Sequence, residues 1–203
     1  LAALLLMASS ARAAEPTPVR PAAPPSAATA RKAYVGLFKD NAVGVLDTGI
    51  NSDHPSFAAV AGDGYQHVNP RGANQYLGHC LTTPSFCNDK LIGAYSFVTE
   101  TTTPEDSDGH GSHTASTAAG NILLDAQLIA PTKSFSFSGI SGVAPRANLI
   151  AYDVCIASGC PGAALLAAVN QAIQDDVDVI NFSISGGVSP YSDATSLAFR
   201  NAY

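Results

Sequence analysis

Two side chains able to move protons stand at positions that would leave them open to a substrate. Asp47 follows an apolar run and precedes a Thr-Gly turn, whereas His110 has a glycine on each side and opens an alanine-rich stretch. The first pattern is typical of a strand end and the second of a helix start. A carboxylate that orients an imidazole, which in turn takes a proton from a hydroxyl, supplies two thirds of the triad used in nucleophilic hydrolysis.

Both residues also allow other interpretations. The string Asp-Thr-Gly at Asp47 occurs in aspartic proteases and often does no more than cap a turn. His110 and His113 could share a helix face and hold a metal with Asp106 or Asp108, but their spacing matches no strong zinc signature. The two aspartates are more simply interpreted as polar residues before a helix. We therefore predict no metal site and no cofactor.

The elements that must position these residues alternate between strands and helices. A helix is expected from Pro161 to Asp175, because apolar residues recur there at helical spacing after a proline suited to the first turn. Short runs that are apolar on both faces predict parallel strands at 43–46, 149–154 and 177–184. The sequence thus predicts a doubly wound α/β fold, with a mainly parallel sheet, helices on both faces and reactive groups at its carboxyl edge.

The first 38 residues differ in composition from the rest of the chain. Residues 1–14 combine a short apolar run with small residues suited to signal peptidase, without a starting Met or basic residues before the run, and predict the remnant of a signal peptide. Residues 15–38 are rich in Pro and Ala and predict a disordered linker. Residues 39–203 then form one domain. We expect the protein to be secreted, into the extracellular space or the periplasm.

Charge and composition exclude several classes of partner. The chain of 203 residues has a formal net charge of -6, only 13% charged residues and no basic cluster. Nucleic acids and anionic membrane surfaces are therefore not expected as partners. With 46% hydrophobic residues the chain can bury one core of ordinary size, and we expect a monomer.

The motifs around Asp47 and His110 resemble the two first signatures of subtilisin-like serine peptidases. They read Val-Leu-Asp-Thr-Gly-Ile at 45–50 and His-Gly-Ser-His-Thr-Ala at 110–115. Further strings at 87–94, 142–147 and 178–183 are most similar to the cucumisin-like branch of secreted subtilases. The resemblance covers about residues 40–203. It implies that Asp47 accepts the Nδ1 proton of His110, which lets Nε2 take a proton from a serine hydroxyl.

A third segment resembles the part of subtilases that binds the substrate backbone. It contains Ser183, Ile184, Ser185 and Gly186 at the end of a predicted strand. Pairing of this segment with an extended peptide would be β-augmentation, which gives affinity with little sequence preference. An ordinary glycine turn is the alternative interpretation. The family usually has one residue fewer here, which leaves the register open by one residue.

The serine that should complete the triad has no counterpart in this sequence. The family's Gly-Thr-Ser-Met-Ala-like turn is absent, and we expect it beyond residue 203. The string Ala-Ala-Gly-Asn at 118–121 resembles the family's oxyanion asparagine motif but precedes the substrate strand, and is interpreted as a helix end. The resemblance implies a secreted endopeptidase that acts on polypeptides, of which this chain is an inactive N-terminal part. A secreted, non-catalytic peptide-binding protein is the alternative.

Four cysteines fall into two locally spaced pairs. In a secreted chain they predict the disulfides Cys80–Cys87 and Cys155–Cys160. A zinc site with four thiolates is the alternative, although the usual two-residue spacing is missing. Calcium is common in subtilases, but no Asp-rich loop assigns a site here. Residues 123–138 lack a clear period and predict a surface loop, which we interpret as an insertion without an assigned role.

Overall fold

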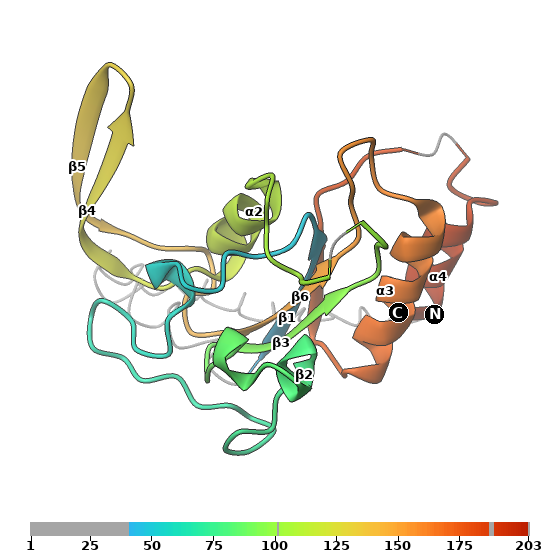
Figure 1. Cartoon of the computed structure of the whole chain (residues 1–203), viewed down its shortest axis with the longest axis horizontal. Helices are drawn as coiled ribbons and strands as arrows, with labels where there is room; N and C mark the ends of the chain where they lie inside the picture. The colour runs from blue at the N-terminus through green and yellow to red at the C-terminus, as the bar shows by residue number, and fades with distance from the viewer. Residues whose placement is uncertain (1–40, 101, 187–188, 203) are drawn as a thin grey trace, which may run out of the picture.

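A five-stranded parallel sheet forms the centre of the computed structural model, which describes residues 41–100, 102–186 and 189–202 (Figure 1). The predicted signal peptide and linker, 1–14 and 15–38, lie outside the described residues. The strand order is β2-β3-β6-β1-β7. The strands are β1 (Ala42–Asp47), β2 (Leu77–Gly78), β3 (Leu91–Ser96), β6 (Asn148–Asp153) and β7 (Val179–Phe182).

The two central strands form because their residues can be buried on both faces. Every residue of β1 and of β6 is buried, which suits their β-branched and aliphatic composition. The strands pair in register from Ala42 opposite Asn148 to Asp47 opposite Asp153. Both aspartates therefore lie at the carboxyl edge of the sheet, where α/β proteins place reactive groups.

Helices cover both faces of the sheet, and the predicted doubly wound α/β fold is confirmed. Helix α2 (His110–Ala119) packs against one face, and α3 (Gly162–Gln174) and α4 (Ala194–Ala202) lie over the other (Figure 1). Side chains alternate along β1 accordingly, since Val45 lies in the cluster with α2 and Leu46 in the cluster with α3. Each fully buried aliphatic side chain of this kind contributes about 1.5–3 kcal/mol.

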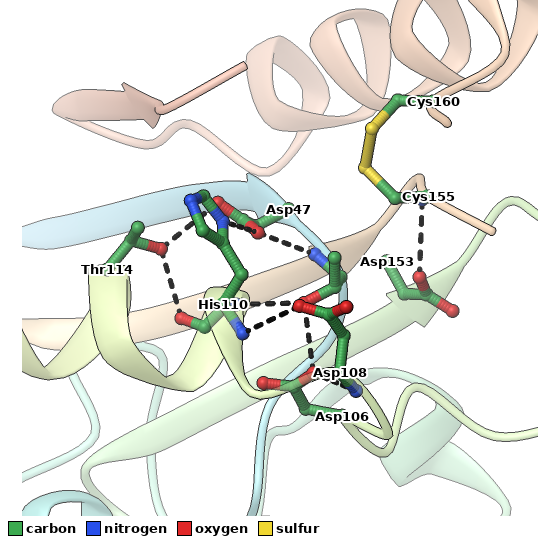
Figure 2. The surroundings of a disulfide bond; sticks show 10 residues. Asp47, Asp106, Asp108, His110, Thr114, Asp153, Cys155 and Cys160 are labelled. Atoms are coloured by element: carbon green, nitrogen blue, oxygen red, sulfur yellow. Dashed lines mark hydrogen bonds and ion pairs between the residues drawn. A yellow bond between two sulfur atoms is a disulfide. The ribbon is translucent and has the colours of Figure 1, made fainter. Parts of the chain in front are cut away.

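Both predicted disulfides are present and lie at different depths. Three short 3-10 helices, η1 (Pro55–Phe57), η2 (His79–Leu81) and η3 (Pro84–Phe86), surround Cys80–Cys87, whose two cysteines are buried in the core on the α2 side. Cys155–Cys160 closes the loop between β6 and α3, beyond the sheet edge that carries Asp47 (Figure 2). Free cysteines are absent from the described residues.

The prediction of a loop at 123–138 is wrong. This segment forms most of an antiparallel hairpin, β4 (Leu123–Ala130) and β5 (Lys133–Ile140), which stands out from the body of the molecule (Figure 1). Leu128 pairs with Phe135 and both side chains are about half exposed. Strand β5 has no buried residue, although Ser-Phe-Ser-Phe-Ser at 134–138 alternates between polar and apolar residues as strands do.

The predicted element limits are close to the observed ones except at the third strand. Helix α3 follows Pro161 and ends before Asp175, nearly as predicted. The strand expected at 177–184 is only Val179–Phe182, because the chain turns at Asp176 with φ 57° and the amide of Val177 bonds back to the carbonyl of Ala172 in α3. Within the described residues, no helix combines the length and apolar character needed to cross a membrane.

Candidate active site

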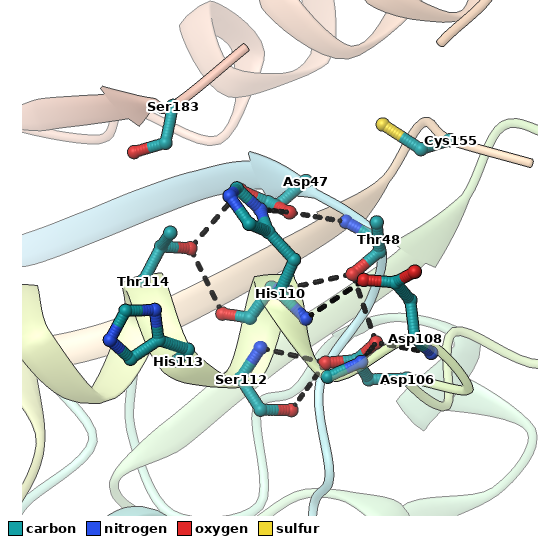
Figure 3. A network of polar contacts seen from close by, with 12 residues as sticks. Asp47, Thr48, Asp106, Asp108, His110, Ser112, His113, Thr114, Cys155 and Ser183 are labelled. Atoms are coloured by element: carbon teal, nitrogen blue, oxygen red, sulfur yellow. Dashed lines mark hydrogen bonds and ion pairs between the residues drawn. The ribbon is translucent and has the colours of Figure 1, made fainter. Parts of the chain in front are cut away.

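Asp47 and His110 meet at the carboxyl edge of the sheet. The Nδ1 atom of His110 lies 2.7 Å from Oδ1 of Asp47, although the two residues are 63 positions apart (Figure 3). Asp47 is the last residue of β1 and points to the same face as Val43 and Val45, which is the face that α2 covers. His110 is the first residue of α2. The fold thus brings together the two residues that the sequence singled out.

Further hydrogen bonds hold the Asp47 carboxylate in place. The backbone amide of Thr48 donates to Oδ1 at 2.9 Å, and the Thr114 hydroxyl lies 3.1 Å from Oδ2. Thr114 is one turn beyond His110 in α2 and is itself positioned by the carbonyl of Gly111. Both carboxylate oxygens therefore have partners, which fixes the plane of the carboxylate toward the imidazole. Sequence reasoning missed Thr114, which the spacing of one helical turn after His110 could have identified.

The surroundings of the two residues differ sharply. Asp47 is 1% exposed, whereas the His110 side chain is 47% exposed. The hydrogen bond that His110 makes to Asp47, and then the negative charge of Asp47, raise the pKa of His110 above its ordinary value, while burial acts in the opposite direction. Within the described residues, the His110 ring makes its hydrogen bond through Nδ1. This geometry suits a base that is oriented at Nδ1 and open at the other ring nitrogen.

Close backbone approach explains the glycines of both motifs. Gly49 has φ 107°, in the left-handed region that favours glycine. A Cβ atom added to Gly111 would lie 2.2 Å from the carbonyl oxygen of Gly49. The first turn of α2 can therefore rest directly on the turn after β1 because Gly111 has no side chain, while a Cβ atom on Gly49 would lie 2.6 Å from the carbonyl oxygen of Pro104.

Asp106 has a larger role than the sequence predicted. It is only 7% exposed, and its carboxylate accepts hydrogen bonds from Thr48, Asp108, Gly109 and Ser112 (Figure 3). Asp108 fits the prediction of an exposed polar residue before a helix, since its side chain accepts only from the amide of His110 among the described residues. Asp106 instead links the end of β1 to the start of α2.

The other residues considered for chemistry lie apart from this pair. His113 is exposed on α2, and the described residues contain no group of three or more His, Cys, Asp or Glu side chains that could hold a metal ion. Asn121, the residue that resembles the oxyanion asparagine, is buried and donates to the carbonyls of Pro55 and Ala58. Asn121 therefore connects the end of α2 to η1, as expected for a structural residue.

The predicted substrate segment follows β7, the neighbour of β1 in the sheet. Ser183 is exposed (Figure 3). Its hydroxyl donates to Oδ1 of Asn181 at 3.1 Å. Ile184, Ser185 and Gly186 line a cavity of about 590 Å³ together with residues of α3, α4 and the loop that contains Cys160. The segment lies outside regular structure and has few hydrogen bonds of its own, and its binding role stays a prediction.

Comparison with known proteins identifies the family. The family model described as the Subtilase family matches residues 39–202. Subtilisin-like protease SBT1.7 of Arabidopsis thaliana is 36% identical over 173 residues, which cover 77% of this chain and 21% of the relative. Subtilisin-like protease SBT1.5 of the same plant is 37% identical over 173 residues, covering 75% and 20%. A crystal structure of a lanthipeptide protease aligns over 86% of this chain and 38% of that chain, with 17% identity and a TM-score of 0.49.

These matches show the family of the chain, but they cover only a small part of each relative. The chain spans about a fifth of the length of the curated relatives it matches. The family model covers both motifs, including the turn at Asp47 and the helix start at His110. The resemblance inferred from these motifs is therefore confirmed, and this chain belongs to the subtilase family.

Proposed function

We propose that this chain supplies the aspartate and the histidine of a serine endopeptidase. The observation that carries the proposal is the 2.7 Å contact between Asp47 and His110 at the sheet edge. In this role Asp47 keeps the Nδ1 proton on His110, and Nε2 removes the proton of a serine hydroxyl as the hydroxyl attacks a peptide carbonyl. The imidazolium then gives that proton to the departing amine. Asp47 stabilises the positive charge that His110 carries in between.

The surroundings of the pair support proton transfer. An imidazole whose pKa is raised by a carboxylate is a stronger base than a free one. The exposed ring can be reached by a hydroxyl from another segment. We place that serine beyond residue 203, in the part of the protein that corresponds to the uncovered length of the relatives.

An extended polypeptide is the proposed substrate. Among the described residues, β7 lies at the edge of the sheet, and the segment 183–186 continues from its carboxyl end. A peptide that pairs with this segment by backbone hydrogen bonds would lie beside His110, since β7 neighbours β1. Backbone pairing gives broad specificity, with preferences set by cavities such as the one lined by Ile184 and Ser185.

Export from the cell is part of the same proposal. Two disulfides within one small domain are characteristic of oxidising compartments, and all four cysteines of the chain are used. The predicted signal peptide remnant at 1–14 agrees with this location. The proposed site of action is the extracellular space or the periplasm.

The test uses the longest protein that contains this chain, expressed with its disulfides. A fluorophosphonate probe should label one serine beyond residue 203, and a quenched peptide library should be hydrolysed. His110→Ala should abolish both signals, while Asp108→Asn should retain them, because Asp108 is exposed and bonds only the backbone amide of His110. The 203-residue chain alone should not be labelled. Peptide binding without labelling or hydrolysis would instead establish the non-catalytic binding protein.

A further inference from the structure

The contact between Asp47 and His110 depends on how helix α2 rests on the end of β1. The two side chains come from different elements, and their direct bond joins a buried carboxylate to a half-exposed ring. A half-exposed imidazole has freedom to turn away into solvent unless its backbone is held. The residues that fix the first turn of α2 on the strand end therefore determine whether the contact persists.

Asp106 holds both elements with one carboxylate. Its Oδ1 accepts from the Thr48 hydroxyl at 2.9 Å, directly after β1, and from the amide of Gly109 at 2.8 Å, directly before α2. Its Oδ2 accepts from the amide of Ser112 at 2.8 Å and from the Ser112 hydroxyl at 2.6 Å, in the first turn of α2. The carboxylate thus bridges the strand end and the helix start (Figure 3).

The two hydroxyls extend this bridge because each one donates and accepts. The Thr48 hydroxyl donates to Asp106 and accepts from the amide of Gly111, which lies next to His110. The Ser112 hydroxyl donates to Asp106 and accepts from the amide of Asn51, in the loop after β1. Each hydroxyl donates its single proton to Asp106. The bridge therefore requires a group at position 106 that only accepts hydrogen bonds.

The ionised form of Asp106 is the one that fits. Burial would raise the pKa of Asp106, but the hydrogen bonds from Ser112, Gly109 and Thr48 outweigh burial and hold the pKa below its ordinary value. An asparagine has nearly the same shape, yet its NH₂ group would face a donor at either position. Asp106→Asn is therefore a substitution that keeps volume and removes the bridge.

We propose that Asp106 is a positioning residue for the site, acting through Thr48 and Ser112 to set the docking of α2 on β1 and hence the contact of His110 with Asp47. The inference deepens the proposed function and rests on it, since this contact is what makes His110 a base. Asp106 itself touches neither His110 nor Asp47 through its side chain among the bonds of the described residues.

The test follows the Nδ1 proton of His110 by NMR in the 203-residue chain, which requires no catalysis. In Asp106→Asn, we expect this proton to exchange with water at least about tenfold faster. The reason is that the hydrogen bond between His110 and Asp47, which breaks rarely in the wild type, should break often in the variant. The pKa of His110 should also fall toward its ordinary value. The matched control is Asp108→Asn, which removes a carboxylate even closer to His110 in sequence but outside the bridge, and should leave the exchange rate within about twofold.

Two more variants keep the proposal open to refutation if Asp106→Asn fails to fold. Ser112→Ala and Thr48→Val each remove one hydroxyl arm, should fold, and should each speed the exchange by a smaller factor. Their double variant should be no worse than the product of the single effects, because both hydroxyls act through the same carboxylate. Folded variants whose Nδ1 exchange and His110 titration match the wild type would overturn the positioning role.

The outcome is distinguishable from failure of the proposed function. If the longer protein shows no serine reactivity while Asp106→Asn still frees the Nδ1 proton, the peptidase proposal fails and the positioning of His110 stands. If the longer protein is an active peptidase and Asp106→Asn changes neither the exchange nor the pH profile of kcat/KM, the positioning proposal fails alone. A stability loss without either change would also reduce Asp106 to a structural residue.

Discussion

Two histidines in this molecule make equally short side-chain contacts, but their pKa values are shifted in opposite directions. His110 contacts the Asp47 carboxylate at 2.7 Å and is half exposed, whereas His67 contacts the amide oxygen of Asn121 at 2.7 Å and is buried. Asp47 raises the pKa of His110, but burial, followed by the charge of Lys90, lowers the pKa of His67 to about 4. The charge of the partner and access to water, more than the contact distance, decide whether an imidazole can act as a base.

The region around His67 contains a second basic group, Lys90, which has no salt bridge among the described residues. Lys90 is fully buried and donates to the backbone carbonyls of Pro145 and Ala147. Burial, followed by the charge of Arg146, lowers the pKa of Lys90 to about 7. We call His67, Lys90 and Asn121 the buried basic cluster. Its hydrogen bonds go to uncharged acceptors, whereas His110 bonds to the charged carboxylate of Asp47.

The largest expected effect comes from removing the charge at Asp47. In the longer protein, Asp47→Asn should lower kcat/KM by about 10⁴, because the imidazole loses its tautomer and the partner of its cationic form. The folded structure should be retained, since Asn can still accept from the amide of Thr48. Steady-state hydrolysis of a fluorogenic peptide measures the loss. A fall of less than tenfold would remove Asp47 from the proposed triad.

A substitution at His67 should produce the reverse pattern. His67→Ala leaves the buried Oδ1 of Asn121 without its partner and opens a cavity, which should reduce the free energy of unfolding by about 2–4 kcal/mol. Urea denaturation of the 203-residue chain measures this loss. The His110 titration should remain as in the wild type, because the buried basic cluster lies away from the sheet edge. A changed His110 titration would show that the two regions are coupled.

Acid should destabilise the fold through His67. Its pKa is about 4 in the folded chain against an ordinary value of 6.5, and the unfolded state therefore binds more protons between these values. The contribution of His67 to the free energy of unfolding is fully present above pH 6.5. It is lost as the pH falls toward 4, by about 3 kcal/mol in total. Urea midpoints between pH 7 and 4 test the slope. His67→Gln, which retains a donor toward Asn121, should flatten this part of the profile.

A rise in stability is expected from Lys90 at higher pH. Because its pKa is lowered from 10.5 to about 7, the unfolded state binds the extra proton between these values, and stability should rise from pH 7 toward pH 10. Lys90→Met should remove this rise, and it should be more favourable relative to wild type at pH 6 than at pH 9. The difference between the two urea midpoints is the measurement. Parallel profiles for both proteins would contradict a depressed Lys90 pKa.

The parts of the fold and site that the sequence predicted are those encoded locally. Strands β1 and β6 are continuous apolar runs, and both disulfides close short loops between neighbouring cysteines. Asp47 and His110 stand beside turn and helix signals that are strong in themselves. These features needed no knowledge of distant contacts, and the local patterns were therefore sufficient.

The features that were missed depend on contacts between distant segments. Asp106 is buried because Thr48, 58 residues earlier, brings it a hydroxyl, and no local pattern separates it from the exposed Asp108. His67 and Lys90 are buried by packing of loops with polar residues, against the usual exposure of their types. The β4–β5 hairpin is an exception, because its second strand contains the local alternation Ser-Phe-Ser-Phe-Ser at 134–138, a strand signal that the prediction did not use.

The central claim is that Asp47 orients His110 and raises its pKa, and a pH titration of the His110 ring by ¹⁵N NMR tests it most directly. In the wild-type chain, the account predicts a proton held on Nδ1 and a pKa above the ordinary value of 6.5. In Asp47→Asn the pKa should fall and the Nδ1 proton should exchange rapidly. Identical titration curves for the two proteins would contradict the account, because they would show that the two side chains do not interact in solution.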